Sequence, residues 1–132
     1  MKDGEHSQKL FNDMKQVTTY KDGKKNGRET YWYPIGQKAS ECFYIDDKLE
    51  GELTAWTEFG LVIQQDNYKS DLLHGLSRVW NEEGQLESEI MFQHGKPSGK
   101  YTLYENGVKV KEGVAEYNKD DSPYNFDNET VN

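Results

Sequence analysis

The chain has 132 residues, which is enough for one domain and too few for two independent cores. Only 33% of the residues are hydrophobic whereas 13% are aromatic, so burial must depend on tyrosine, tryptophan and phenylalanine, as in a thin extended sheet. The formal net charge of −8 repels the phosphates of nucleic acids and of anionic lipids, and we expect neither class of ligand.

The acidic side chains are concentrated in the middle of the chain. Residues 1–40 contain eight basic and five acidic side chains, residues 41–90 contain three and twelve, and residues 91–132 contain five and seven. An acidic surface steers a basic partner toward it, but acidity also serves solubility alone. The charge pattern therefore fits both a binding role and a purely solvated surface.

Residues 1–19 are predicted to cap one end of the fold. Leu10, Met14 and Val17 would align on one face of a helix. Alternatively, Phe11-Asn12-Asp13 is the end of a degenerate repeat in which Phe11 takes the place of a tryptophan found in later copies. Both interpretations predict a cap, because a terminal repeat has one edge that faces water.

Four copies of a 24-residue repeat follow, at residues 20–43, 44–67, 68–91 and 92–116. Each copy opens with an aromatic residue, has a glycine seven positions later and has a second aromatic residue five positions after that. The first aromatic column comprises Tyr20, Tyr44, Tyr68 and Phe92, the glycine column comprises Gly27, Gly51, Gly75 and Gly99, and the second aromatic column comprises Trp32, Trp56, Trp80 and Tyr104. We interpret these columns as the structural core of a stacked array.

The composition inside one period predicts two antiparallel strands joined by tight turns. Runs such as Gly51 to Trp56 are strand-like, and they alternate with turn sequences such as Asn81-Glu82-Glu83-Gly84. Because an isolated hairpin is marginally stable, the hairpins are expected to pair side by side. The predicted fold is all-β, an antiparallel meander of β-hairpin repeats in a single elongated, curved sheet. Residues 117–132, rich in asparagine and aspartate, are predicted to form an acidic, partly flexible tail.

No residue pattern indicates catalysis. The single cysteine, Cys42, rules out an internal disulfide and is interpreted as an ordinary strand residue. His6, His74 and His94 lack metal-ligand spacing, and no nucleophile motif or phosphate-binding glycine loop is present. We therefore expect no enzyme activity, no metal and no cofactor. No apolar stretch has the length of a signal peptide or a membrane span, which favours a cytoplasmic protein.

The repeat resembles a known family. The segments Tyr20 to Gly27 and Phe92 to Gly99, each followed by a strand with an aromatic residue, are similar to the MORN repeat, and most closely to its bacterial variant in YwqK-type antitoxin proteins. The second and third copies depart from the pattern, with Asp47 and Asp71 in place of its first glycine. The resemblance implies a hairpin scaffold. Because bacterial relatives are often antitoxins or immunity proteins against secreted toxins, it also implies that role here.

Three non-enzymatic functions are considered. In the first, the acidic surface neutralises a basic toxin of the nuclease or deaminase type, and the candidate partner-binding residues are Asp46, Asp47, Glu50, Asp71, Glu82 and Glu83. In the second, the aromatic columns form cages for quaternary ammonium ligands. In the third, the array is a passive assembly scaffold that offers open strand edges to another chain.

Overall fold

The structure, a computed structural model, describes residues 3–116 and 130–131. These residues form one sheet in which every strand pair is antiparallel, as the repeat pattern predicts. Its strands are β1 (Gly4–Lys9), β2 (Lys15–Lys21), β3 (Lys24–Trp32), β4 (Lys38–Ile45), β5 (Lys48–Leu49), β6 (Gly51–Trp56), β7 (Val62–Lys69), β8 (Leu72–Leu73), β9 (Gly75–Trp80), β10 (Leu86–Gln93), β11 (Lys96–Glu105), β12 (Val108–Ala115) and β13 (Thr130–Val131). The predicted all-β meander is confirmed.

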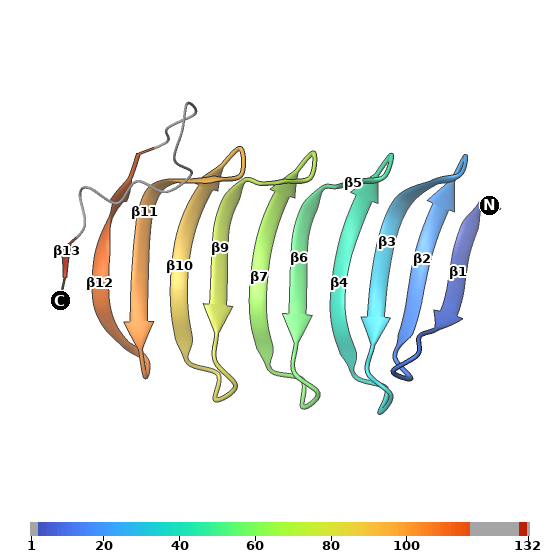
Figure 1. Cartoon of the computed structure of the whole chain (residues 1–132), viewed down its shortest axis with the longest axis horizontal. Coiled ribbons are helices and arrows are strands. Elements are labelled where there is room, and N and C mark those ends of the chain that lie inside the picture. The colour runs from blue at the N-terminus through green and yellow to red at the C-terminus, as the bar shows by residue number, and fades with distance from the viewer. Residues whose placement is uncertain (1–2, 117–129, 132) are drawn as a thin grey trace.

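The strands follow one another across the sheet in sequence order, and the sheet stays open (Figure 1). The short strands β5 and β8 extend the pairing of β4 and β7 at one end. We call the row of turns at the top of Figure 1 the upper edge, formed by residues 21–24, 45–48, 69–72 and 93–96. The lower edge is the opposite row of turns, formed by residues 10–14, 33–37, 57–61, 81–85 and 105–108.

The N-terminal segment is a hairpin, so the helical alternative for this cap is wrong. Strands β1 and β2 pair from Gly4 with Tyr20 to Lys9 with Lys15. Leu10 and Met14 close the turn between them through a backbone hydrogen bond of 2.7 Å. Phe11 lies at the tip of this turn with its side chain fully exposed, and does not occupy a position like that of Trp32. Of the tail predicted at residues 117–132, only β13 is described, and it pairs with β12.

The two aromatic columns lie on opposite faces of the sheet. Residues paired directly across an antiparallel ladder share a face, and neighbours along a strand alternate between faces. Tyr20, Tyr44, Tyr68 and Phe92 pair with Lys25, Leu49, Leu73 and Pro97, and they define the tyrosine face. Trp32, Trp56, Trp80 and Tyr104 pair with Lys38, Val62, Leu86 and Lys109, and they define the tryptophan face. Both faces are therefore partly apolar.

The core of this single-layer sheet runs along its midline and contains many polar side chains. All of the aromatic residues in the two columns are half-buried. Most of the buried side chains lie between them: Thr18, Glu29, Cys42, Asp66 and Tyr101 on the tyrosine face, and Thr30 and Thr54 on the tryptophan face. Pro97 is fully buried as well and pairs with Phe92 of the first column. The carboxylate of Glu41 accepts a 3.0 Å hydrogen bond from Thr30, and that of Glu89 accepts one of 2.8 Å from Arg78. Cross-strand pairs of this kind hold the midline together.

Candidate functional site

The upper edge is built from two-residue turns with left-handed backbone geometry. In the second and third repeats these residues are Asp46 and Asp47, with φ of 47° and 69°, and Ser70 and Asp71, with φ of 47° and 72°. Positive φ at both central residues is the geometry that continues the twist of a hairpin. Aspartate tolerates this geometry, so Asp47 and Asp71 replace glycine without loss of the turn.

The two aspartates that replace glycine also join neighbouring repeats. The Asp47 carboxylate accepts a 2.7 Å hydrogen bond from the Lys25 N–H, and the Asp47 N–H donates one of 2.9 Å to the Lys25 carbonyl. Asp71 makes the same pair of bonds with Leu49, at 2.8 Å and 3.0 Å. Gly95 makes only the backbone bond, of 2.8 Å, to Leu73. These carboxylates therefore already perform a structural task.

A second set of side chains accepts hydrogen bonds from the first residue of the next upper turn. Asn26 accepts a 3.0 Å bond from the Asp46 N–H, and Glu50 accepts one of 2.7 Å from the Ser70 N–H. His74 is placed in the same way, with its Nδ1 3.4 Å from the His94 nitrogen. The sequence signal for this column is an acceptor side chain 20 residues before the turn residue. Comparison of equivalent positions does not reveal it, because the two residues belong to different copies of the repeat.

The six predicted partner-binding residues do not form one patch. Asp46, Asp47 and Asp71 lie on the upper edge, and Glu50 is hydrogen-bonded to Ser70 of that edge. Glu82 and Glu83 lie at the tip of a turn on the lower edge (Figure 1). All except Glu50 are exposed. The upper turns also carry exposed lysines, Lys48 and Lys69, so their local charge is nearly balanced.

The tips of the lower edge combine apolar and acidic side chains. Phe11 and Phe59 are 102% and 91% exposed, and Ile35 is 69% exposed. Glu58, Glu82 and Glu83 are exposed in the same row of turns. Sequence reasoning chose Glu82 and Glu83 for their charge but missed Glu58 and Phe59, because the sequence alone does not show which side chains share the lower edge.

A hollow of about 420 Å³ lies between the lower turns of β3–β4, β6–β7 and β9–β10. Its lining residues are Tyr33, Thr57, Glu58, Phe59, Ile63 and Glu82. The Tyr33 hydroxyl donates a 2.7 Å hydrogen bond to the Trp56 carbonyl and thereby ties two repeats together beside the hollow. A lining that combines Phe59 and Ile63 with the carboxylates of Glu58 and Glu82 suits a side chain that is apolar along its length and cationic at its end.

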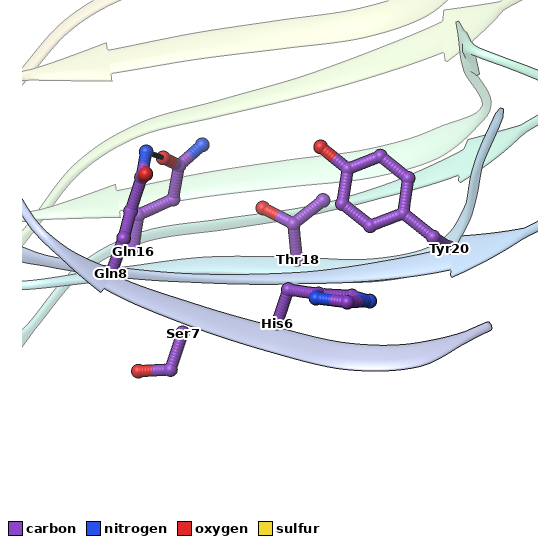
Figure 2. Close-up of a pocket in the computed structure, with 6 residues that line it drawn as sticks. All are labelled: His6, Ser7, Gln8, Gln16, Thr18 and Tyr20. Atoms are coloured by element: carbon purple, nitrogen blue, oxygen red, sulfur yellow. Dashed lines mark hydrogen bonds between the residues drawn. The ribbon is translucent and has the colours of Figure 1, made fainter. Parts of the chain in front are cut away.

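A smaller hollow of about 220 Å³ lies over the first two strands and is lined by His6, Ser7, Gln8, Gln16, Thr18 and Tyr20. Figure 2 shows Gln8, Gln16, Thr18 and Tyr20 on one side of these strands and Ser7 directed to the other side. Gln8 donates a 2.6 Å hydrogen bond to Gln16. The His6 and Tyr20 rings meet edge to face at 5.3 Å. This hollow is polar and lies at the outer margin of the sheet.

Two buried carboxylates on the tyrosine face were not identified from the sequence. Burial tends to raise the pKa of Glu29, but hydrogen bonds from Lys25, Thr18 and Gln16 outweigh it and hold this pKa below its usual range. Asp66, which is 2% exposed, accepts hydrogen bonds from Gln64 and Ser77. Both carboxylates are satisfied within the sheet, so their geometry describes a structural core.

Cys42 and several aromatic rings are likewise engaged in the fold. Burial raises the pKa of the buried Cys42 thiol to about 11, which disfavours the reactive thiolate. Lys25, Arg28 and Lys38 lie over the rings of Tyr44, Phe43 and Trp32, at 4.8, 5.4 and 5.7 Å from the ring centres. Cations of the chain itself therefore cover these three rings.

Comparisons with known proteins give no family assignment, since no protein-family model and no curated protein matches the chain. Within residues 3–116 and 130–131, no three or more histidine, cysteine, aspartate or glutamate side chains are grouped so as to hold a metal ion. The same residues contain no helix that is long and apolar enough to cross a membrane.

Proposed function

We propose that this protein is a non-catalytic binding module of the antitoxin or immunity class, and that it neutralises a basic protein toxin of the nuclease or deaminase type. The observation that carries the proposal is the hollow on the lower edge, where Phe59 and Ile63 lie beside Glu58 and Glu82. Exposed aromatic anchors surrounded by charge are typical of protein-binding surfaces. Carboxylates at the margin favour a partner that presents lysine or arginine.

The lower edge suits this role better than the upper edge. Asp47 and Asp71 on the upper edge bind the backbone of the preceding repeat, and lysines flank them in the same turns. The lower turns at residues 57–61 and 81–85 contain Glu58, Glu82 and Glu83 and no lysine or arginine. The lower tips therefore present uncompensated negative charge beside exposed apolar side chains.

The repeat itself supports the antitoxin class. The segments Tyr20 to Gly27 and Phe92 to Gly99 resemble the MORN repeat of YwqK-type antitoxins, as described above. A fold alone does not determine function, so the class rests on this resemblance and the binding surface rests on the geometry of the lower edge.

Affinity capture from the native cell, with two matched variants, tests the proposal. The lower variant, Glu58→Gln, Glu82→Gln and Glu83→Gln, removes three negative charges from the proposed surface. The upper variant, Asp46→Asn, Asp47→Asn and Asp71→Asn, removes three from the other edge and keeps side chains that accept hydrogen bonds and tolerate positive φ. We expect wild type and the upper variant to retain a basic partner, and the lower variant to lose it.

Three further results separate the parts of the proposal. Binding of the partner should weaken as added salt screens the charge pairs. The captured protein should arrest growth when it is expressed alone, and co-expression of this chain should relieve that arrest. Equal capture by all three proteins contradicts the lower edge as the surface, and loss with the upper variant alone assigns binding to the upper turns. A captured partner without toxicity contradicts the antitoxin class and leaves the binding module intact.

A further inference from the structure

The outer margin of β1 is a regular, unpaired strand edge. The ladder between β1 and β2 runs through six residue pairs without a register shift, whereas the long ladders farther along the sheet contain irregularities. Strand β1 contains no proline, and among the described residues no strand pairs with its other side. Natural sheets protect such an edge with a bulge, a proline, a covering segment or charged side chains, and of these β1 has only the charges of Glu5 and Lys9. At the opposite margin, β12 is paired by β13.

The hydrogen-bonding pattern shows which groups of β1 point outward. The Leu10 N–H bonds the Met14 carbonyl across the first turn, and hydrogen-bonded and non-hydrogen-bonded pairs alternate along an antiparallel ladder. The even-numbered residues of β1 therefore direct their backbone groups toward β2. The backbone N–H and C=O groups of Glu5, Ser7 and Lys9 point away from the sheet, where an added strand can bind them.

We propose that two copies of this chain pair antiparallel through β1, about a two-fold axis that passes between their Ser7 residues. In this register Ser7 pairs with Ser7 of the second copy, and Glu5 of each copy pairs with Lys9 of the other. The backbone N–H and C=O groups of Glu5, Ser7 and Lys9 all point away from the sheet, as hydrogen-bonded pairs in the new ladder require. A register that overlaps all six residues would pair Glu5 with Gln8, whose backbone groups point inward, and is excluded.

The charges support this register. Glu5 and Lys9 are exposed, and directly opposed side chains of opposite charge stabilise a strand pair. The Nζ atom of Lys9 also lies 3.4 Å from Oδ1 of Asp13, in an ion pair whose side chains are 74% and 71% exposed. Such exposed ion pairs contribute little to stability, so Lys9 can pair with Glu5 of the second copy instead. The two-fold axis produces the Glu5–Lys9 contact twice.

The arrangement has a consequence for the shape of the assembly. Because paired residues share a face, the tyrosine faces of the two copies continue into one surface, and the polar hollows in which His6 and Gln8 lie become neighbours (Figure 2). Rotation about an axis normal to the sheet reverses the strand direction of the second copy. The lower edge of one copy therefore lies next to the upper edge of the other, along the same row of turns. Neither lower edge is covered, and each remains accessible to a partner.

The test is a charge exchange measured by sedimentation equilibrium of the full chain across a range of concentrations. Glu5→Lys places two lysines opposite each other, Lys9→Glu places two glutamates opposite each other, and each change should weaken dimerisation about tenfold. The double variant restores opposite charges and should restore the wild-type dimer. Glu87→Lys and Lys100→Glu, which make the same charge changes on exposed residues of β10 and β11, should leave the dimer unchanged.

A second measurement locates the contact. Amide hydrogen exchange at Ser7 and Lys9 should slow as protein concentration rises, because these N–H groups gain partners only in the dimer. Ser7→Pro removes an outward N–H that the monomer does not use, so it should abolish the dimer while the thermal midpoint of the monomer stays the same. A monomer at every concentration, or a dimer that is indifferent to the charge exchange and leaves these amides unprotected, overturns the proposal.

Discussion

At the scale of single residues, Asp47 shows how a departure from a repeat pattern becomes part of the fold. Its backbone has a φ of 69°, and its carboxylate and N–H both bond Lys25 of the preceding repeat. Glycine, the residue that the pattern predicts here, would supply the conformation without the side-chain bond, as Gly95 does in its own turn. The aspartates therefore add a contact between repeats that glycine cannot make.

Replacing Asp47 separates the two contributions. Asp47→Ala loses the bond to the Lys25 N–H and strains a left-handed position, so we expect a loss of about 2 kcal/mol in the free energy of unfolding. Asp47→Gly loses only the bond and should cost about 1 kcal/mol. Asp47→Asn retains an acceptor and should remain near wild type. Urea denaturation of the three variants measures this order, and an equal loss in all three would contradict it.

Glu29 predicts an acid-sensitive contribution to stability. Burial tends to raise its pKa, but hydrogen bonds from Lys25, Thr18 and Gln16 hold it below 4.5, its ordinary value. Because the pKa of Glu29 is lower in the folded state than in the unfolded state, the ionised carboxylate stabilises the fold at pH values above the unfolded-state pKa. This stabilisation is lost as the pH falls through the folded-state pKa. Unfolding measured between about pH 7 and pH 3 should show wild type more stable than Glu29→Gln at neutral pH. The difference should narrow below about pH 4.5, and a constant difference would argue against this origin.

At the scale of elements, the lower turns have their own internal bonds. The side-chain oxygen of Asn81 accepts hydrogen bonds of 2.9 Å and 3.0 Å from the N–H groups of Glu83 and Gln85. The Thr57 hydroxyl accepts 3.2 Å bonds from Phe59 and Leu61 in the equivalent turn. Side chains that accept bonds from the backbone two residues ahead favour turns over continued strands. They hold the tips that carry the proposed binding surface.

Asn81→Ala should therefore loosen one turn of the lower edge. The lost bonds are partly replaced by water because the tip is exposed, so we expect a cost of about 1 kcal/mol in the free energy of unfolding. Asn81→Thr, which copies the side chain of the neighbouring turn, should recover much of this loss. Thermal unfolding provides the comparison. If the proposed function holds, capture of the partner should fall with Asn81→Ala and return with Asn81→Thr.

The sequence predicts the hairpins because columns of glycine and aromatic residues recur inside each period. The helical alternative for the N-terminal cap is wrong. Leu10, Met14 and Val17 do have helical spacing, but Val17 pairs with Ser7 of β1 and with Thr30 of β3, so it belongs to a strand. The contact of Asp47 with Lys25 joins residues of different copies, which comparison of equivalent positions cannot reveal. Phe59 and Glu58 on the lower edge are not predicted for a different reason, which is that neither residue has a counterpart in every repeat.

At the scale of the whole molecule, the repeats interact mainly with their neighbours, and the contacts between them are interchangeable. Asp71 binds Leu49 as Asp47 binds Lys25, and Ser70 bonds Glu50 as Asp46 bonds Asn26. If residues 44–67 are removed, Tyr68 follows Phe43 in the place of Tyr44. The turn of Ser70 and Asp71 then lies beside Asn26 and Lys25, where Ser70 and Asp71 can make the hydrogen bonds that Asp46 and Asp47 make in the full chain. The stability of such an array is approximately a sum over repeats and their interfaces.

This deletion variant should fold as a shorter meander. We expect a lower free energy of unfolding and a denaturant m-value reduced by about a fifth, in proportion to the surface that one repeat buries. Removal of residues 44–55, which is half a period, provides the control. It would join the upper end of one hairpin to the lower end of the next and leave the turns without their partners on the preceding repeat, so this variant should not fold. Circular dichroism with urea denaturation compares them, and failure of both deletions would show that the second repeat has a role its neighbours cannot supply.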